Sequence, residues 1–241
     1  MKNAWIVAAA ATAAVSTSSL ANSIIQVNRA SGYHENLIVS GTGGGEFTVS
    51  RVSGAGIGET GLASDRAANS FQTFCVELNQ PIGTGQYRAQ VNDEVLTGAP
   101  GFNTIQETTA WLYVQFRRGG LASIGYDYDP NATRAESASA LQLAIWRLQG
   151  QFGEPGQSGT RNNNLINALN DNQLALDFIA AAQSAVGNGW TNTSVRVLNV
   201  GSKNGTDWDN QDLLTLIPLP SGGGLAAAGL MGLVALRRRR A

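Results

Sequence analysis

The sequence has few residues of the kinds that most often perform chemistry in proteins. Its 241 residues include one cysteine, Cys75, one histidine, His34, and two lysines, Lys2 and Lys203. A Cys/His zinc cluster needs several ligands and a CxxC pair needs two cysteines, so both are excluded. The sequence contains no P-loop, and no GxGxxG motif precedes a predicted helix. We therefore expect no metal site, no cofactor and no nucleotide chemistry.

The first 21 residues have the pattern of a secretory signal peptide. Lys2 precedes an apolar stretch from Ala4 to Val15, and Ser19-Leu20-Ala21 supplies the small residues that signal peptidase requires. We predict a signal peptide over residues 1–21 and begin the folded domain at residue 22. The alternative is an alanine-rich first helix of that domain.

The other end of the chain carries a second targeting pattern. Pro218-Leu219-Pro220 is followed by glycines, an apolar stretch from Leu225 to Leu236, and an arginine cluster. The cluster consists of Arg237, Arg238, Arg239 and Arg240. The apolar stretch is short for a membrane span, which needs about 20 residues, and the arginines would act as a cytoplasmic stop. The composition alone predicts a weak transmembrane anchor.

Residues 217–241 resemble the PEP-CTERM family of sorting signals, in which a Pro-containing motif, an apolar helix and an arginine cluster follow one another. Pro218-Leu219-Pro220 is similar to the PLP variants of that motif, because leucine stands where glutamate is commonest. The resemblance implies processing by an exosortase-type enzyme and transient inner-membrane contact through the C-terminal helix. It also implies export to the surface, or the exterior, of a Gram-negative bacterium.

The net charge of the remaining domain bears on its partners. Without the two ends, 11 basic and 17 acidic residues remain, which gives a formal charge near −6. A mildly acidic surface argues against a nucleic-acid partner and suits a secreted, soluble domain.

The region between the two ends shows strand patterns, then helix patterns, then strand patterns again. Strands are expected at 23–28, 36–40, 46–52, 71–78, 86–91, 195–200 and 212–217. Helices are expected after the capping-box patterns at Thr104 and Thr133 and from about 170 to 186, with loop over 151–163. We expect 86–91 to pair with 71–78 as a hairpin.

This order of elements predicts one α+β domain over residues 22–216. Its first and last strands would share an antiparallel β-sandwich or barrel-like core, and a helical subdomain would be inserted over about 103–187.

Within the predicted strand 71–78, Cys75 alternates with apolar residues. Phe74, Val76 and Leu78 point to one face, whereas Cys75 and Glu77 point to the other. The thiol is therefore expected on the more mixed face of the strand.

Two other patterns suggest chemistry weakly. His34 could act as a base for Cys75 in a hydrolase, but it lies in an early glycine-flanked stretch with nothing to orient it. Asp127-x-Asp129-x-Asn131 copies the start of a calcium loop, yet Ala132 and Ala138 stand where that loop needs glycine and glutamate. We expect an Asx-rich turn that caps the following helix, and calcium stays open as an alternative.

Gln142 is the most informative polar residue of the predicted helices. It lies one turn after Ala138 and one turn before Trp146, on an otherwise apolar face. A buried carboxamide must find hydrogen-bond partners, so Gln142 is either an ordinary satisfied glutamine or part of a site.

Two motifs in this order resemble the thioester domains of bacterial surface adhesins. These motifs are Phe74-Cys75-Val76-Glu77 and Leu141-Gln142-Leu143-Ala144-Ile145-Trp146, and the helix Ala110-Trp111-Leu112-Tyr113 between them is also similar. The resemblance covers roughly residues 71–150. In that family the cysteine and the glutamine supply the two halves of an internal thioester.

The resemblance implies a Cys75–Gln142 cross-link, with Phe74 and Trp146 as supporting residues that keep water away. The thioester would attach the protein once to an amine of a host or matrix partner, so no catalytic residue of a turnover enzyme is expected. Few lysines would limit attack on the protein's own thioester.

Two alternatives remain beside the thioester adhesin. The first is a non-covalent structural protein of a biofilm or matrix, with Cys75 as a free thiol or an intermolecular disulfide. The second, a carbohydrate-binding sandwich contacting polysaccharide, lacks an aromatic platform in the sequence.

Overall fold

The computed structural model describes residues 23–29, 44–54, 56–58, 69–96, 102–205 and 207–217. The predicted signal peptide, the strand expected at 36–40, His34 and the sorting signal from Pro218 to Arg240 lie outside these residues. Among the described helices, none is long and apolar enough to cross a membrane.

Six strands form one antiparallel sheet in the order β3-β2-β1-β4-β5-β6. The strands are β1 (Ser23–Asn28), β2 (Phe47–Ser53), β3 (Ser70–Thr73), β4 (Gly85–Asn92), β5 (Val195–Ser202) and β6 (Leu213–Leu216). The first and last strands therefore share a sheet, as the sequence predicts. The expected hairpin is wrong, because β4 pairs with β1 and β5. It does not pair with residues 71–78, which we call the Cys75 segment.

The sheet curls until its two outer strands meet. Leu214 donates its N–H to the carbonyl of Phe74 (3.1 Å), and Val76 donates to the carbonyl of Asp212 (2.9 Å). The Thr73 hydroxyl also donates to the carbonyl of Leu214 (2.6 Å). The core is thus a single, nearly closed barrel-like sheet, and the two-sheet sandwich is not formed.

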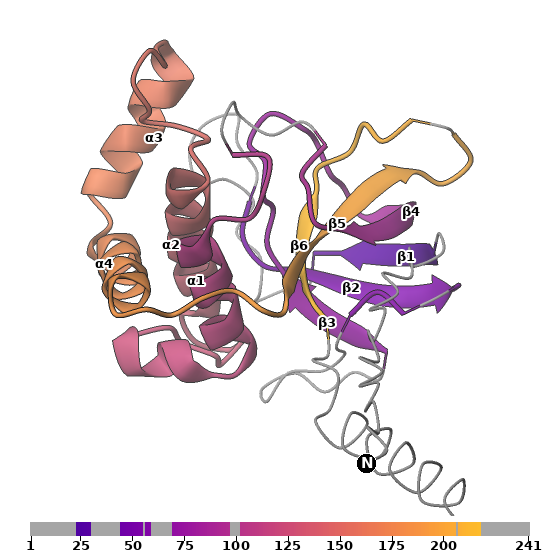
Figure 1. The fold of residues 1–241 in the computed structure, drawn as a ribbon, viewed down its shortest axis with the longest axis horizontal. Helices are drawn as coiled ribbons and strands as arrows, with labels where there is room; N and C mark the ends of the chain where they lie inside the picture. The colour runs from indigo at the N-terminus through magenta and orange to yellow at the C-terminus, as the bar shows by residue number, and fades with distance from the viewer. Residues whose placement is uncertain are drawn as a thin grey trace, which may run out of the picture.

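Helices are inserted between β4 and β5 and lie on one side of the sheet (Figure 1). They are α1 (Glu107–Arg117), a 3-10 turn η1 (Gly120–Ile124), α2 (Arg134–Leu148), α3 (Thr160–Asn170) and α4 (Gln173–Gly187). Helices α1 and α2 lie nearest the sheet, and α3 lies farther out (Figure 1). The α+β class and the inserted helical block are therefore confirmed.

The start of α2 is fixed by a fully buried ion pair. Arg134 contacts Glu46 through two charge-assisted hydrogen bonds, Nη2 to Oε1 (2.6 Å) and Nε to Oε2 (2.9 Å), and both side chains are inaccessible. The Tyr126 hydroxyl donates to the same carboxylate (2.8 Å), and Arg134 also donates to the carbonyl of Tyr128 (2.7 Å). This cluster sets where the remaining turns of α2 meet the sheet.

Some local expectations are wrong. Neither Gln106, the residue before α1, nor Thr133, the residue before α2, makes a side-chain cap, so the two capping boxes do not form. The Thr133 hydroxyl instead donates to Asp127 (2.8 Å). Helix α3 begins at Thr160, inside the expected 151–163 loop, because buried Leu165 and Leu169 give its polar sequence an apolar edge.

Candidate functional site

Cys75 lies where the barrel closes. It comes two residues after the end of β3 and forms an isolated antiparallel bridge with Leu213 at the start of β6. The strand expected over 71–78 therefore ends at Thr73. Beyond that point the segment pairs with β6 through Phe74 and Val76, which leaves the N–H and C=O of Cys75 facing the opposite way.

Gln142 meets the backbone of Cys75 on that opposite side. Cys75 donates its N–H to Oε1 of Gln142 (3.0 Å), and Nε2 of Gln142 donates to the Cys75 carbonyl (2.8 Å). Both residues are completely buried. The carboxamide thus satisfies both backbone groups of Cys75, as a residue on a neighbouring strand would.

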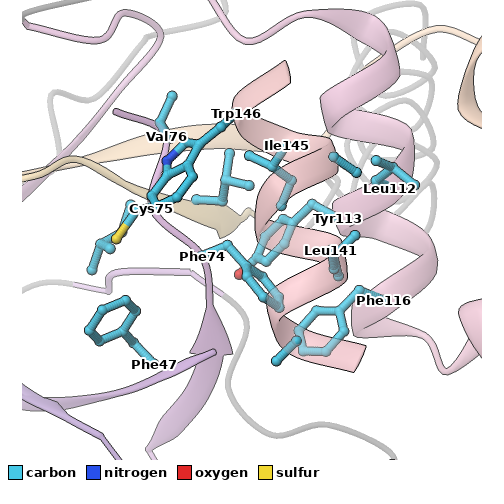
Figure 2. Packing of buried hydrophobic residues seen from close by; sticks show 14 of the residues in the cluster. Phe47, Phe74, Cys75, Val76, Leu112, Tyr113, Phe116, Leu141, Ile145 and Trp146 are labelled. Atoms are coloured by element: carbon cyan, nitrogen blue, oxygen red, sulfur yellow. The ribbon is translucent and has the colours of Figure 1, made fainter. Parts of the chain in front are cut away.

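Side-chain directions around Cys75 follow the expected alternation. In Figure 2 the Phe74 ring points toward α1 and α2, whereas the Cys75 sulfur points away from them, on the side of Phe47. The Phe74 ring packs edge-on against Phe116 in α1, with ring centroids 4.9 Å apart. The face that carries Cys75 and Glu77 is mixed in sequence but is buried like the other face, because the Cys75 side chain points away from the helices, toward Phe47 in the barrel.

Trp146 supports the segment one turn beyond Gln142. It is fully buried, and its indole Nε1 donates to the carbonyl of Glu77 (3.1 Å). The indole therefore contacts the same segment as Gln142 and excludes solvent from this side.

Three further residues form hydrogen bonds to the backbone of this segment, although the sequence did not identify them as site residues. Tyr113 donates its hydroxyl to the carbonyl of Gln72 (3.0 Å), Oε1 of Gln151 accepts the N–H of Leu78 (3.0 Å), and Nε2 of Gln211 donates to the carbonyl of Glu77. Only Tyr113 lay in a sequence motif. Gln151 and Gln211 have no sequence signal, because each acts through a backbone group distant in the chain.

The environment of the Cys75 thiol disfavours ionisation. Burial raises its pKa well above the usual range, the positive charge of Arg29 opposes that rise, and the charge of Glu77 adds to it. The thiol is therefore kept neutral and protected from oxidation in this conformation.

Asp212 is a buried acidic residue close to the Cys75 segment, as Glu77 is within it. Asp212 accepts hydrogen bonds from the N–H of Leu96 (2.9 Å) and from Asn199 (2.7 Å), and its own N–H donates to Glu77 (2.9 Å). Burial, together with the charge of Glu77, raises the pKa of Asp212 to about 7. Folding therefore favours the protonated form of this carboxyl group.

The calcium-like loop forms the expected Asx-rich turn, but the residue before α2 makes no side-chain cap, so the expected capping of that helix is wrong. Asp127 accepts the N–H groups of Asp129 (2.8 Å) and Thr133 (3.0 Å), and Asp129 accepts the N–H of Asn131 (2.9 Å). The bonds from the N–H groups of Asp129 and Thr133, together with one from the Thr133 hydroxyl, hold the pKa of Asp127 below its usual value. Within the described ranges no group of His, Cys, Asp and Glu residues is arranged to hold a metal ion.

The structure therefore brings Cys75 and Gln142 into direct contact, with Trp146 beside them and Phe74 turned toward the helices. Comparison with known proteins gives no family model, no curated protein and no solved structure that matches this chain.

Proposed function

We propose that this is an exported surface or extracellular-matrix protein in which Cys75 and Gln142 form an internal thioester for covalent attachment to an amine-bearing partner. The observation that carries the proposal is the paired contact between the Gln142 carboxamide and the backbone of the only cysteine. A glutamine so placed presents its carbonyl carbon to the residue that carries the thiol.

The same two hydrogen bonds suit the bond-forming step. In that step the Cys75 sulfur attacks the carbonyl carbon of Gln142, the C–N bond breaks, and the thiol proton leaves with the nitrogen as ammonia. Negative charge developing on Oε1 is stabilised by the N–H of Cys75, which already donates to that atom. The Cys75 carbonyl holds the departing nitrogen.

For this reaction the thiol must turn about its Cα–Cβ bond. The sulfur lies on the side of Phe47 in Figure 2, whereas the carboxamide lies along the backbone edge of Cys75. A rotamer change within a packed interior is a local rearrangement that leaves the two backbone hydrogen bonds in place.

The thioester is then an activated acyl group enclosed in an apolar core. An incoming amine would attack the Gln142 carbonyl, form an amide with the partner and release Cys75 as a thiol. The buried indole of Trp146 excludes water, which would otherwise hydrolyse the bond. The protein would react once and would not turn over.

Export and sorting belong to the same proposal. The signal peptide, the exosortase-type processing of Pro218 to Arg240 and surface display rest on the sequence patterns alone. Fractionation of cells expressing the full chain would test them: we expect mature protein that begins near residue 22 and lacks the arginine cluster. Intact precursor retained in the cytoplasm would contradict this part.

The second candidate is a non-covalent matrix protein with a free Cys75. It is favoured by the fact that Gln142 and the Cys75 backbone already satisfy each other without a covalent bond. Because Cys75 is fully buried, a disulfide to another chain would require the segment to open, so this candidate keeps the thiol free.

Labelling with methylamine separates the two candidates. The thioester predicts a methylamide at residue 142 and a new titratable thiol at Cys75, both absent from Cys75→Ala and Gln142→Ala variants. Peptide mapping that finds no methylamide at residue 142 in a folded domain would support the free-thiol candidate.

A further inference from the structure

One pocket of the described structure lies beside the segment that carries Cys75. It has a volume of about 240 Å³ and is lined by Arg29 after β1, Phe47 in β2, residues 78–82, Arg161 in α3 and Gln211 before β6. A water molecule takes about 30 Å³ in the liquid, so the pocket has room for several water molecules or for a few side-chain groups of a ligand. It is smaller than the usual site for a drug-sized molecule.

Two arginines are held in this pocket by neutral groups. Arg29 donates from Nη2 to the carbonyl of Ile82 (2.8 Å), and its guanidinium lies over the Phe47 ring, 5.5 Å from the centroid. Arg161 donates to the carbonyl of Leu78 (2.9 Å) and to Asn79 (3.2 Å).

Among the residues that the structure describes, neither guanidinium forms an ion pair with a carboxylate. Each keeps N–H donors that these contacts do not use, because a guanidinium has five. Two positive charges therefore meet in one small pocket of a domain whose formal charge is near −6. This arrangement fits an anionic ligand that receives hydrogen bonds from both arginines.

The pocket lies on the sulfur side of the Cys75 segment. The Cys75 sulfur points to the side of Phe47, which lines the pocket (Figure 2). Arg29 is close enough for its charge to oppose the rise in the pKa of Cys75. Leu78 and Gln211 connect the pocket to the segment, since Gln211 donates to the carbonyl of Glu77.

We propose that this pocket binds a carboxylate of the attachment partner and thereby selects a lysine that has an acidic side chain next to it in a peptide. The inference rests on the proposed thioester for its role in coupling, but carboxylate binding itself does not. Guanidinium groups bind carboxylates with two parallel hydrogen bonds, which would fix the orientation of the peptide.

The pocket would also favour the reactive form of the amine. Nearby positive charges raise the cost of an ammonium group, so a lysine entering here would lose its proton more readily and become nucleophilic. A peptide is the partner that this chemistry favours, because one chain supplies both the carboxylate and the amine. A uronic acid sugar supplies the carboxylate alone.

The experiment has a binding arm and a coupling arm. In the binding arm, the Cys75→Ala domain, which cannot form a thioester, is titrated with acetyl-Glu-Lys-amide and acetyl-Gln-Lys-amide and followed by NMR chemical shifts. We expect the Glu peptide to bind about tenfold more tightly, from charge-assisted hydrogen bonds worth about 1.5 kcal/mol. Arg29→Gln and Arg161→Gln should remove that preference. Arg118→Gln, at an exposed arginine after α1, should not.

In the coupling arm, the unmodified domain reacts with the same peptides and with methylamine, and adducts are counted by intact mass. We expect faster coupling of the Glu peptide, with the advantage lost in Arg29→Gln while the rate with methylamine is kept. Equal binding of the two peptides would overturn the inference, and so would tighter binding of glucuronate than of the Glu peptide. Charge-selective binding without any coupling would confirm the carboxylate pocket and contradict the thioester.

Discussion

Gln142 takes the place of a neighbouring strand at Cys75. Its carboxamide accepts the N–H of Cys75 at 3.0 Å and donates to the carbonyl of the same residue at 2.8 Å. Strand β2 pairs with β3 only as far as Thr73, so no described strand reaches Cys75 on that side. A single helical side chain therefore supports the backbone at the point where the barrel closes.

Replacing Gln142 by methionine should destabilise the domain even when no thioester can form. In a Cys75→Ala background, the change leaves the N–H and C=O of residue 75 buried without partners, which should cost about 2–4 kcal/mol of unfolding free energy. Urea unfolding measures this. Gln183→Met, at an exposed position in α4, is the matched control and should change stability little. A loss below about 1 kcal/mol at residue 142 would contradict the structural role.

Replacing Trp146 by phenylalanine should loosen the same segment. The change removes the hydrogen bond from Nε1 to the carbonyl of Glu77 and leaves a small void in a fully buried site. We expect a loss of about 1–3 kcal/mol in unfolding free energy and faster hydrolysis of the thioester. Trp190→Phe, at a half-buried tryptophan, serves as the control. Equal losses of unfolding free energy in the two variants would show that the hydrogen bond from Trp146 to the Glu77 carbonyl does not stabilise the domain.

The ion pair between Arg134 and Glu46 should show strong energetic coupling. Glu46→Gln leaves a buried guanidinium without its counter-charge and should cost about 3–5 kcal/mol, whereas replacing both residues by methionine should cost less than that single change. A double-mutant cycle measures the coupling. Asp93→Asn, which breaks the exposed ion pair with Arg196, should cost under about 1 kcal/mol. If the losses of unfolding free energy from the single changes at Glu46 and Arg134 simply add in the double variant, the expected coupling between the two residues is absent.

Asp212 should make the domain less stable as the pH rises from about 4 to 7. Its folded-state pKa of about 7 lies above the ordinary aspartate value of 3.8, so over this window the folded state holds a proton that the unfolded state has lost. This contribution is fully present below the unfolded pKa and is lost as the pH rises through the folded pKa, by on the order of 4 kcal/mol.

Urea unfolding at pH 5 and pH 8 measures that effect. Glu77→Gln keeps an acceptor for the Asp212 N–H but removes the neighbouring charge. The difference in unfolding free energy between pH 5 and pH 8 should therefore shrink. Asp209→Asn, at an exposed position, should leave the difference unchanged. An unaltered difference in Glu77→Gln would show that its charge does not set the pKa of Asp212.

Periodicity predicted the elements more reliably than it predicted their partners. Strands β1 and β2 and helices α1, α2 and α4 lie close to their expected positions, because their buried faces repeat with the strand or helix period. The pairing of β4 with β1 and β5 could not be predicted, since it depends on how the sheet curls. Helix α3 was missed because its asparagine-rich sequence has low helix propensity.

The contact between Cys75 and Gln142 could be anticipated only from the order of two motifs and their resemblance to a family. The way the two residues meet could not. That depends on the end of β3 at Thr73 and on the buried Arg134, which fixes α2, and neither feature has a local pattern. The pocket arginines, Arg29 and Arg161, are likewise far apart in sequence and come together only in the fold.

Intact mass of the freshly purified domain, without its signal peptide and sorting tail, tests the central claim most directly. The thioester predicts a mass lower than the sequence mass by one ammonia, with no titratable thiol after unfolding in acid, and full mass in both Cys75→Ala and Gln142→Ala. A folded domain with the full sequence mass and one titratable thiol would contradict the thioester and leave Gln142 as a structural partner of Cys75.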